Sequence, residues 1–380
     1  MTPKIASFLA DHGPATPCLV VDVDQVELRY CEIEAALPTA RIYYAVKANP
    51  ALPVLQRLVS LGSCFDAASW EEIRLCLDAG ADASAISFGN TIKKASAISS
   101  AHAAGVTMFA FDCDEELEKL ARFAPGARVY CRLLVENEGA DWPLSRKFGT
   151  SVEHARTLML RARDLGLDPY GLSFHVGSQQ TDTAAYEAAI GRAAMLFTDL
   201  AAAGLDIRML NLGGGFPTRY RDEVPPIEDF AFAIHRAMTR HFGNALPEMI
   251  VEPGRSVVGD AGVISSEVVL VSRRGLPGGA ADPVRWVYLD IGRFGGLAET
   301  ENESIKYRFR TPHDGGTTGP VALAGPTCDG ADILYERSGY RLPLDLATGE
   351  RVELLSTGAY VSTYCSTRFN GFAPLAEHYI

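Results

Sequence analysis

The stretch IYYAVKA, residues 42–48, is a short apolar run that carries a single lysine, Lys47, near its carboxyl end. Its β-branched and aromatic residues predict a strand. Further runs of this kind alternate with segments that have the spacing of amphipathic helices. The eight predicted strands are 42–48, 64–68, 85–88, 108–112, 129–135, 171–176, 209–213 and 249–252. Strands that alternate with helices in this way predict a (β/α)8 barrel rather than an open sheet.

The segments between and around these strands complete the predicted organisation. Helices are predicted at 70–80, 92–105, 114–123, 152–165, 184–204 and 227–242, and a strand at 16–22 and a helix at 26–37 precede the barrel. After residue 259 the pattern changes to β-rich segments at 263–272, 284–291, 320–324 and 351–355, with an exposed loop at 274–283. We therefore expect a barrel domain over 24–260 and a C-terminal β-domain over 261–380, with 1–23 as a candidate contribution to it.

Composition excludes several classes of function. The 380 residues are 47% hydrophobic and 22% charged, as in soluble globular proteins, and the net charge of −12 disfavours nucleic acids and acidic membranes as partners. No apolar run is long enough to span a bilayer and no signal peptide is recognisable, so we expect a cytoplasmic protein. The eight cysteines lack the paired spacing of zinc sites, and no metal site is predicted.

Polar residues and glycines gather at the ends of the predicted strands, where the active sites of such barrels lie. They are Lys47, Asp66, Arg132, His175, Ser178, Gly213, Gly214, Gly215, Glu252, Gly254 and Arg255. A lysine in an apolar strand has a lowered pKa when desolvated and can form a Schiff base with an aldehyde cofactor, although a lysine snorkelling from the strand end would look the same. The glycine triplet suits an anion site or a tight strand-to-helix turn.

The segment Glu252-Pro-Gly-Arg255 joins a carboxylate and a guanidinium across a turn. A structural ion pair is one interpretation. In the other, Glu252 faces a pyridine nitrogen and keeps it protonated, while Arg255 and nearby amides hold a phosphate. His175 is either a core histidine or a ring that stacks on a cofactor, and Ser178 is a candidate phosphate ligand.

These residues stand in motifs that follow one another along nearly the whole chain. The motifs are Tyr44-Ala-Val-Lys47-Ala-Asn, Phe65-Asp66-Ala-Ala-Ser69, His175-Val-Gly-Ser178, Gly213-Gly-Gly215-Phe-Pro, Glu252-Pro-Gly-Arg255, Gly325-Pro-Thr-Cys328-Asp329-Gly and Gly358-Ala-Tyr360. In this order they resemble the fold type III, alanine racemase-like pyridoxal-phosphate decarboxylases, which act on ornithine, lysine, arginine or diaminopimelate. The resemblance implies pyridoxal 5'-phosphate as cofactor.

The resemblance also implies a role for each residue. Lys47 would hold the cofactor covalently, His175 would stack on its ring, and Glu252 would bind the pyridinium nitrogen. The phosphate would be held by Ser178, Gly213, Gly214, Gly215, Arg255 and Tyr360. Gly254 would be a further cofactor-binding residue, and Asp66 and Arg132 would support the site around Lys47.

The β-domain has a part of its own in this family. Cys328 and Asp329 reach the active site of the other subunit, which implies a homodimer with two shared sites. Cys328 is the family's candidate acid for protonation of the α-carbon. We therefore hypothesise that loss of Cys328 permits protonation on the cofactor carbon and slow inactivation by transamination.

Two regions bear on the amino-acid substrate. Diaminopimelate decarboxylases usually have glutamate at the position of Asp329. Ornithine and lysine decarboxylases have aspartate there, as this chain does. The negative charge of Asp329 suits a distal ammonium group of the substrate. Decarboxylases of small diamines carry an aspartate in a short turn, which corresponds here to Asn302 or Glu303, and Phe369 is a further substrate-binding candidate. Residues 300–303 also read as a helix capping box. Ornithine, giving putrescine and carbon dioxide, is the first candidate, ahead of lysine and an unusual diamino acid.

Three other classes compete with a decarboxylase. An amino-acid racemase on the same fold would use the same bound cofactor, but such enzymes commonly set an arginine against the pyridine nitrogen, where this chain has Glu252. A single-domain cofactor carrier would lack the β-domain that supplies Cys328 and Tyr360. A catalytically dead homologue would have no need of Lys47, Cys328 and Glu252.

Overall fold

The computed structural model describes residues 1–135, 140–142, 147–275 and 283–380. The chain divides into two compact units, and each is described by itself. The barrel unit consists of Glu27–Pro217 and Val224–Val257, and the β-unit of Met1–Val26, Thr218–Glu223 and Val258–Ile380. Among the described residues, none of the helices combines the length and the apolar character needed to cross a membrane.

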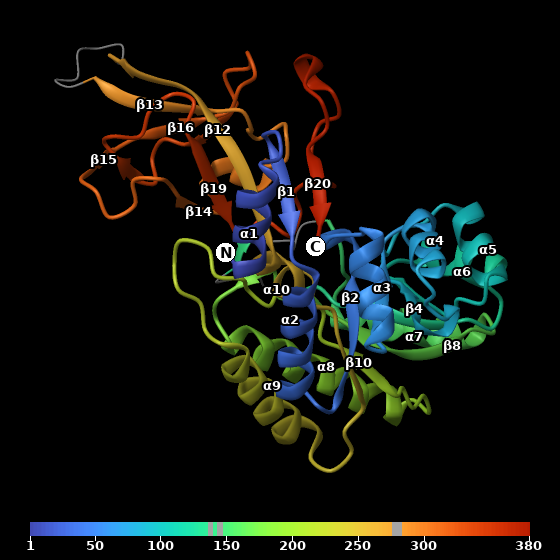
Figure 1. Ribbon diagram of the computed structural model, residues 1–380. Coiled ribbons are helices and arrows are strands. Elements are labelled where there is room, and N and C mark those ends of the chain that lie inside the picture. Colours follow the sequence, from blue (N-terminus) through green and yellow to red (C-terminus); the bar gives the residue numbers. More distant parts are fainter. Residues whose placement is uncertain (136–139, 143–146, 276–282) are drawn as a thin grey trace. The chain divides into compact units, whose positions relative to one another are not determined.

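The barrel unit is built on a closed ring of parallel strands, which confirms the predicted (β/α)8 barrel (Figure 1). The ring contains β2 (Ala40–Ala45), β3 (Cys64–Ala67), β4 (Ile86–Phe88), β5 (Met108–Phe111), β6 (Arg128–Arg132), β8 (Asp168–Ser173), β10 (Met209–Asn211) and β11 (Glu248–Val251). The ring closes where β11 pairs with β2. All eight predicted strands are present, with ends that differ from the prediction by a few residues.

Helices follow most of the strands, as the apolar spacing predicts. They are α2 (Val23–Ala36), α3 (Leu52–Ser60), α4 (Trp70–Asp78), α5 (Ala95–Ala103), α6 (Asp114–Phe123), α7 (Val152–Asp164), α8 (Ala184–Ala202) and α9 (Ile227–Phe242), with short turns η1 (Val46–Ala48) and η2 (Ala83–Ala85). Serine side chains cap α4 and α7. Ser69 and Ser151 each accept the N–H of the residue three positions further along the chain. The helix α3, for which the sequence analysis made no prediction, begins with proline at its second position and buries Val54, Leu55 and Leu58.

A packed core fills the barrel. One buried cluster combines side chains from seven of the ring strands, and because such residues can meet only inside the ring, the barrel is solid rather than a pore. The cluster includes Tyr43, Met108, Tyr130 and Ile250. The Tyr130 hydroxyl lies 2.8 Å from the Ser87 hydroxyl, so the polar group of the Tyr130 side chain has a hydrogen-bond partner within the core. The packed core supports the strand ends, from which the candidate site residues extend.

The β-unit is built on one branched sheet. Its main order is β14 (Arg308–Arg310), β19 (Arg351–Leu355), β12 (Gly262–Arg274), β13 (Val284–Leu289), β16 (Ala322–Ala324) and β17 (Ile333–Tyr335). The first strand, β1 (Cys18–Val21), pairs antiparallel with β12 and parallel with the last strand, β20 (Ala376–Tyr379). The predicted strand at 16–22 therefore belongs to this sheet. Most of the predicted loop at 274–283 lies outside the described residues.

The remaining elements are short. They are α1 (Pro3–His12), α10 (Arg255–Val258), the pair β15 (Thr318–Pro320) and β18 (Arg341–Pro343), the pair β7 (Ala140–Trp142) and β9 (Ser178–Gln180), and the turns η3 (Gly259–Ala261), η4 (Ala298–Glu303) and η5 (Phe369–Gly371). The sequence analysis predicted no helix at α1, of which only Ile5 is buried.

Candidate active site

The lysine of the first barrel strand lies just beyond that strand. The predicted strand 42–48 is too long, because β2 ends at Ala45 and the turn η1 follows. The Tyr44 hydroxyl donates to the Asn49 carbonyl at 2.9 Å and closes the turn. Val46 and Ala48 are buried, whereas Lys47 is exposed at the rim of the barrel. Lys47 therefore reaches the carboxyl ends of the strands rather than lying within the apolar ring.

Two carboxyl-bearing residues, the buried Asp66 and the half-buried Glu252, stand at the ends of the two strands that flank β2 in the ring. Asp66 lies in β3 and is only 5% exposed, and Glu252 follows β11 directly. Burial raises the pKa of Asp66 well above its ordinary value, the Glu252 carboxylate raises it further, and the Lys47 ammonium opposes the shift. These three predicted residues therefore interact electrostatically at one end of the barrel.

Asp66 has an unused hydrogen-bonding atom. Its Oδ1 is buried, and within the described part of the chain no group donates to it. A Cβ atom on Gly89 would lie 1.8 Å from this oxygen, so the segment after β4 must pack against the carboxyl group without a side chain. A buried oxygen without a partner is costly, and it suits a polar group of a bound molecule.

His175 follows β8, and its ring orientation is fixed by the backbone. The Gly177 N–H donates to His175 Nδ1 at 3.0 Å, which leaves Nε2 to carry the proton of the neutral ring. Burial lowers the pKa of His175 well below its ordinary value, and the cations Arg132 and Lys47 lower it further. The structure thus brings Arg132, the last residue of β6, into the same electrostatic site with a neutral imidazole.

The glycine triplet follows β10 but does not begin a helix. The tight strand-to-helix interpretation is wrong, because α9 begins only at Ile227. Gly213 and Gly215 have positive φ angles of 69° and 103°. Cβ atoms on Gly213 and Gly214 would lie 2.3 Å and 2.4 Å from backbone carbonyl oxygens. Only glycine allows this close packing of the loop against its neighbours.

The loop offers free donors. Gly213 gives its N–H to the Asn211 side chain, whereas the N–H groups of Gly214 and Gly215 have no acceptor in the described ranges. Nearby, Arg255 is 3% exposed and donates from Nε and Nη2 to the Ser178 hydroxyl at 3.3 Å and 3.2 Å. Backbone amides, a hydroxyl and a buried guanidinium are the donors that a phosphate group requires.

Gly254 joins the two turns that carry the site. A Cβ atom at this position would lie 2.9 Å from the Cβ atom of Ala48, so the turn after β11 packs closely on η1. The Pro253 carbonyl also accepts the Ala45 N–H at 3.1 Å. The turn that carries Glu252 and the turn that carries Lys47 are therefore held together by backbone contact.

Two further polar residues of the barrel contact or adjoin the candidate site and were not predicted from the sequence. The Asn211 side chain is buried, donates to Glu252 Oε1 at 2.5 Å and accepts the Gly213 N–H at 2.9 Å. Nothing in the sequence around it marks it out. Glu72 accepts the Ala68 N–H at 2.7 Å; burial raises the pKa of Glu72 and the Lys47 charge lowers it. Ser69 accepts the Glu72 N–H at 3.1 Å, and the Ser-x-x-Glu spacing typical of a helix start is a signal that locates this carboxyl group.

The other predicted residues all lie in the β-unit. Cys328 and Asp329 are exposed on the loop between β16 and β17, and the Cys328 N–H donates to the Asn370 side chain at 3.1 Å. Phe369 begins η5, and its ring centroid lies 4.7 Å from that of Phe294. Tyr360 is partly buried and has a positive φ angle of 56°.

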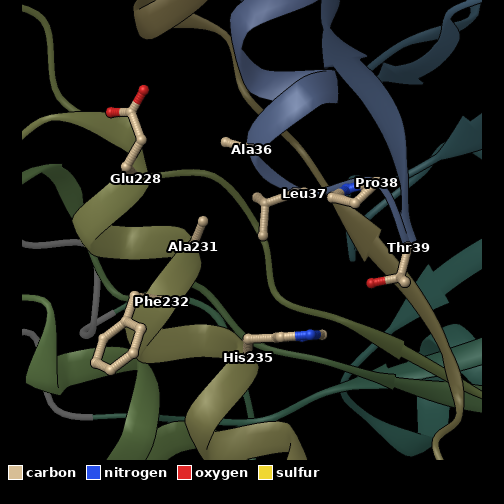
Figure 2. A pocket seen from close by; sticks show the side chains of 8 residues that line it. All are labelled: Ala36, Leu37, Pro38, Thr39, Glu228, Ala231, Phe232 and His235. Atoms are coloured by element: carbon tan, nitrogen blue, oxygen red, sulfur yellow. The ribbon is translucent and has the colours of Figure 1, made fainter.

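A cavity lies beside this loop within the β-unit. Its volume is about 400 Å³, and its lining includes Phe294, Thr327, Phe369 and Phe372. It therefore borders the segment that carries Cys328. A second groove, of about 270 Å³, lies in the barrel unit between residues 36–39 and the helix α9 (Figure 2). That groove adjoins the amino end of β2, opposite to the strand ends that carry the site.

The turn η4 distinguishes the two candidates for the substrate aspartate. The Glu303 carboxylate accepts the N–H groups of Glu336 and Arg337, each at 2.8 Å, and the Ser338 hydroxyl. Burial raises the pKa of Glu303, but these hydrogen bonds outweigh burial and lower the pKa overall. Asn302 is exposed, with a φ angle of 54°.

The capping-box interpretation of residues 300–303 is wrong. The Thr300 hydroxyl donates to the Leu297 carbonyl at 2.7 Å instead of accepting an N–H bond, and the φ angle of Glu303 is 59°. The chain leaves the helical conformation here, so no helix follows for a box to cap.

Comparison with known proteins gives the family. The family model for the pyridoxal-dependent decarboxylase, pyridoxal binding domain, matches residues 23–259. Lysine/ornithine decarboxylase of Selenomonas ruminantium is 35% identical over 374 residues, which cover 98% of this chain and 91% of that protein. Antizyme inhibitor 2 of Xenopus laevis is 33% identical over 387 residues, which cover 98% of this chain and 80% of that protein.

Solved structures agree. Lysine/ornithine decarboxylase of Vibrio vulnificus, complexed with cadaverine, has a TM-score of 0.86 and 30% identity, and the match covers 99% of this chain and 97% of that one. The chain belongs to the pyridoxal-dependent decarboxylases. Its cofactor is pyridoxal phosphate. The partnerless Asp66 oxygen and the free N–H groups of Gly214 and Gly215 fit such a group, since they supply a polar contact and anion donors.

Proposed function

We propose that this protein decarboxylates a basic L-amino acid, with ornithine as the first candidate and lysine as the alternative. The observation that carries the proposal is the electrostatic grouping of Lys47, Asp66 and Glu252 at the carboxyl end of the barrel. A lysine for covalent attachment beside a carboxylate for a pyridine nitrogen is the pair that this chemistry needs. The names of the relatives, lysine/ornithine decarboxylases among them, support the substrate class.

The barrel residues divide the work of holding the cofactor. Pyridoxal phosphate, when bound, supplies an electron-withdrawing pyridinium ring that takes up the electron pair left behind by carbon dioxide. Lys47 attaches it. Glu252, with Oε1 occupied by Asn211, keeps Oε2 to hold a proton at the pyridine nitrogen. His175, neutral and oriented by Gly177, is suited to cover the ring without adding a charge.

The phosphate end is held by a different set of residues. Gly214 and Gly215 present N–H groups that have no acceptor among the described residues, and Ser178 is held by Arg255. Arg255 is buried, and a buried guanidinium that is placed before the anion arrives costs little reorganisation. Tyr360 of the β-unit is the proposed further phosphate ligand.

We also propose a homodimer in which the β-domain of one subunit completes the site of the other. The domain boundaries are then 24–260 for the cofactor-binding barrel and 261–380, with 1–23, for the β-domain. Cys328 and Asp329 are exposed in the single chain, as residues that serve a partner must be. Leu52, Ile92 and Leu134 follow β2, β4 and β6 and are 46%, 52% and 44% exposed. This apolar rim at the catalytic end suits coverage by a second subunit.

In this arrangement Cys328 donates the proton that the α-carbon needs after carbon dioxide leaves. Asp329 faces the distal ammonium group of the substrate, with Phe369 beside it. In the turn η4, Glu303 is engaged by the segment 336–338, so Asn302 is the residue left to meet substrate. A neutral amide attracts an ammonium group less than a carboxylate does, which keeps lysine or a modified diamino acid as alternatives to ornithine.

The test is carbon dioxide release by the cofactor-loaded protein with ornithine, lysine, arginine, diaminopimelate and 2,4-diaminobutyrate. We expect the highest kcat/KM with ornithine. Release from none of them, with the cofactor covalently bound and the optical rotation of the amino acid decaying, would indicate a racemase instead. Failure to bind cofactor at all would indicate a protein that acts without catalysis.

Two variants refine the substrate assignment. Asn302→Asp adds a negative charge at an exposed position, and we expect the KM for ornithine to fall about tenfold. Glu303→Gln leaves the charge at residue 302 unchanged and weakens the anchor of the turn, so we expect a lower Tm with an unaltered KM. The opposite pattern would make Glu303 the recognition residue.

A further inference from the structure

We propose that Asp332 is a positioning residue for the proton donor Cys328. Its carboxylate, buried inside the β-unit, fixes the loop of residues 325–331 that carries Cys328 and Asp329. The inference rests on the proposed role of Cys328 and assigns a function to a residue that has none in the site described above.

The Asp332 carboxylate accepts hydrogen bonds from the loop that carries Cys328 and from a second segment of the β-unit. The residue is 2% exposed. Its Oδ1 accepts the Arg293 N–H at 2.8 Å, and its Oδ2 accepts both the N–H and the hydroxyl of Thr327, at 3.0 Å and 2.7 Å. Three donors from two separate segments thus converge on one carboxylate, and one of these segments is the residue just before Cys328.

The backbone of Asp332 closes the same loop. Its carbonyl accepts the Gly325 N–H at 2.8 Å, and its N–H donates to the Asp329 carbonyl at 3.1 Å. The first residue of the loop and the residue after Cys328 are therefore both tied to Asp332. The loop is defined by contacts to one residue rather than by a strand or a helix.

Two glycines make room for this carboxylate. A Cβ atom on Gly292 would lie 2.1 Å from Asp332 Oδ1, and one on Gly325 would lie 2.4 Å from both oxygens. Neither glycine has a positive φ angle, so space alone is the reason for glycine at both positions. The first glycine of the motif Gly325-Pro-Thr-Cys328 is thereby explained.

Cys328 depends on these ties because it has few of its own. Its side chain is exposed, and its N–H donates to the Asn370 side chain at 3.1 Å. A general acid works only within hydrogen-bonding reach of the atom that it protonates. Two contacts therefore determine the position of the thiol. Asp332 binds Thr327, the residue before Cys328, and the Asn370 side chain accepts the Cys328 N–H.

A carboxylate is the side chain that this loop requires. A carboxylate accepts hydrogen bonds at both terminal oxygens, whereas an asparagine amide accepts them only at its one oxygen. The NH2 group of asparagine would therefore face either the Arg293 N–H or the Thr327 donors. Asp332→Asn therefore keeps the shape but opposes donor to donor, and leaves at least one buried N–H unsatisfied.

The proton balance supplies a specific readout. When the bond between the α-carbon and carbon dioxide breaks, the Cys328 thiol gives its proton to the α-carbon, and the thiolate regains a proton from solvent. A misplaced thiol would leave the proton to come from solvent at the cofactor instead of from Cys328 at the α-carbon, and water would then release an aldehyde and pyridoxamine phosphate in place of the amine. The ratio of pyridoxamine phosphate to carbon dioxide reports where the acid stands, and a general loss of stability leaves it unchanged.

The experiment measures this ratio for the holoenzyme and its variants. For Asp332→Asn we expect the ratio to rise on the order of tenfold, and for Cys328→Ala to rise further. If Asp332 acts through Cys328, the double variant matches Cys328→Ala. Asp22→Asn is the control in the same unit, because Asp22 is also buried and accepts the Thr2 hydroxyl at 2.6 Å and the Asp24 N–H at 3.1 Å. Its ratio should equal that of the wild type.

The outcomes separate the two proposals. A wild-type ratio for Asp332→Asn, with a raised ratio for Cys328→Ala, overturns the positioning role. An unchanged ratio for Cys328→Ala overturns the proposed role of the thiol itself. Should Asp332→Asn fail to fold, Thr327→Val removes only the hydroxyl donor to Oδ2 and is expected to raise the ratio several-fold.

Discussion

The barrel site and the Cys328 loop position their chemical groups in two different ways. In the barrel, Asp66, His175 and Glu252 stand at the ends of different strands of one closed ring, and neighbouring backbones hold the connecting turns. In the β-unit, the loop of residues 325–331 depends on the side chain of Asp332. In the barrel, many backbone contacts hold the site residues in place, whereas in the β-unit one carboxylate, that of Asp332, holds the loop of residues 325–331.

This contrast predicts which single substitutions reduce activity. In the barrel, changes to the reacting groups themselves should dominate, because the ring holds its shape without them. In the Cys328 loop, a residue that touches no substrate should matter nearly as much as the acid that it holds.

The largest effect is expected for Lys47→Ala. Without the amine, the protein has no covalent attachment for its cofactor, and we expect carbon dioxide release to fall by about 10³-fold or more. Visible absorbance of the bound cofactor and kcat are the measurements. Lys94→Ala, at the exposed lysine that directly precedes α5, is the control and should keep both. A variant at position 47 that retained a tenth of the activity would contradict the assignment.

A fall of about 10²-fold in kcat is expected for Glu252→Gln. A neutral amide no longer holds the proton at the pyridine nitrogen, although the turn after β11 stays in place. The matched control is Glu248→Gln at the opposite end of the same strand, where the carboxylate binds Arg41 at 3.2 Å and the Tyr170 hydroxyl. That control should lower the Tm slightly and spare kcat. Equal losses in both variants would mean that the strand, and not the carboxylate, is the sensitive feature.

Asn211→Asp tests whether the barrel site also depends on a hydrogen bond between side chains. The variant keeps an acceptor for the Gly213 N–H but places a second carboxylate against Glu252. We expect kcat to fall about tenfold, with little change in KM, because the two charges repel and disturb Glu252. A loss as large as that of Glu252→Gln would show that Asn211 is as decisive in the barrel as Asp332 is proposed to be in its loop.

The smallest effect concerns the pH dependence of stability. The pKa of His175 is lowered in the folded state, so below its ordinary value of 6.5 the unfolded chain binds a proton that the folded chain does not. Stability contributed by this residue is therefore present above about pH 6.5 and is lost as the pH falls, at up to about 1.4 kcal/mol per pH unit. His175→Phe should lose less stability than the wild type between about pH 7 and pH 5 in urea unfolding. An identical pH dependence would mean that the folded protein protonates this histidine freely.

The sequence predicts, for a physical reason, which residues the barrel brings together at its strand ends. Lys47, Asp66, His175 and Glu252 were found because strands have a recognisable period and because the carboxyl ends of barrel strands meet at one face. The errors arose where the backbone leaves regular structure. The turn η1 takes Lys47 out of its strand, and the positive φ angles of Asn302 and Glu303 replace the expected capping box.

Residues that act through others left little trace in the sequence. Asn211 and Asp332 carry no periodic signal, since their roles are contacts to groups that are distant along the chain, such as Arg293 for Asp332. Glu303 likewise binds residues more than thirty positions further on, which local spacing cannot reveal. Such contacts become visible only once the fold has brought the segments together.

The pairing of β1 has a consequence for the order in which the protein is made. The barrel strands all lie between Ala40 and Val251, so the ring can close while the rest of the chain is still being synthesised. The strand β1, by contrast, pairs with β12 and with β20, the last strand of the chain. At about 5–20 residues per second, β1 waits for tens of seconds until both neighbours leave the ribosome. Of the described strands of this sheet, the earliest is therefore among the last to be paired, and until then its open edges favour aggregation.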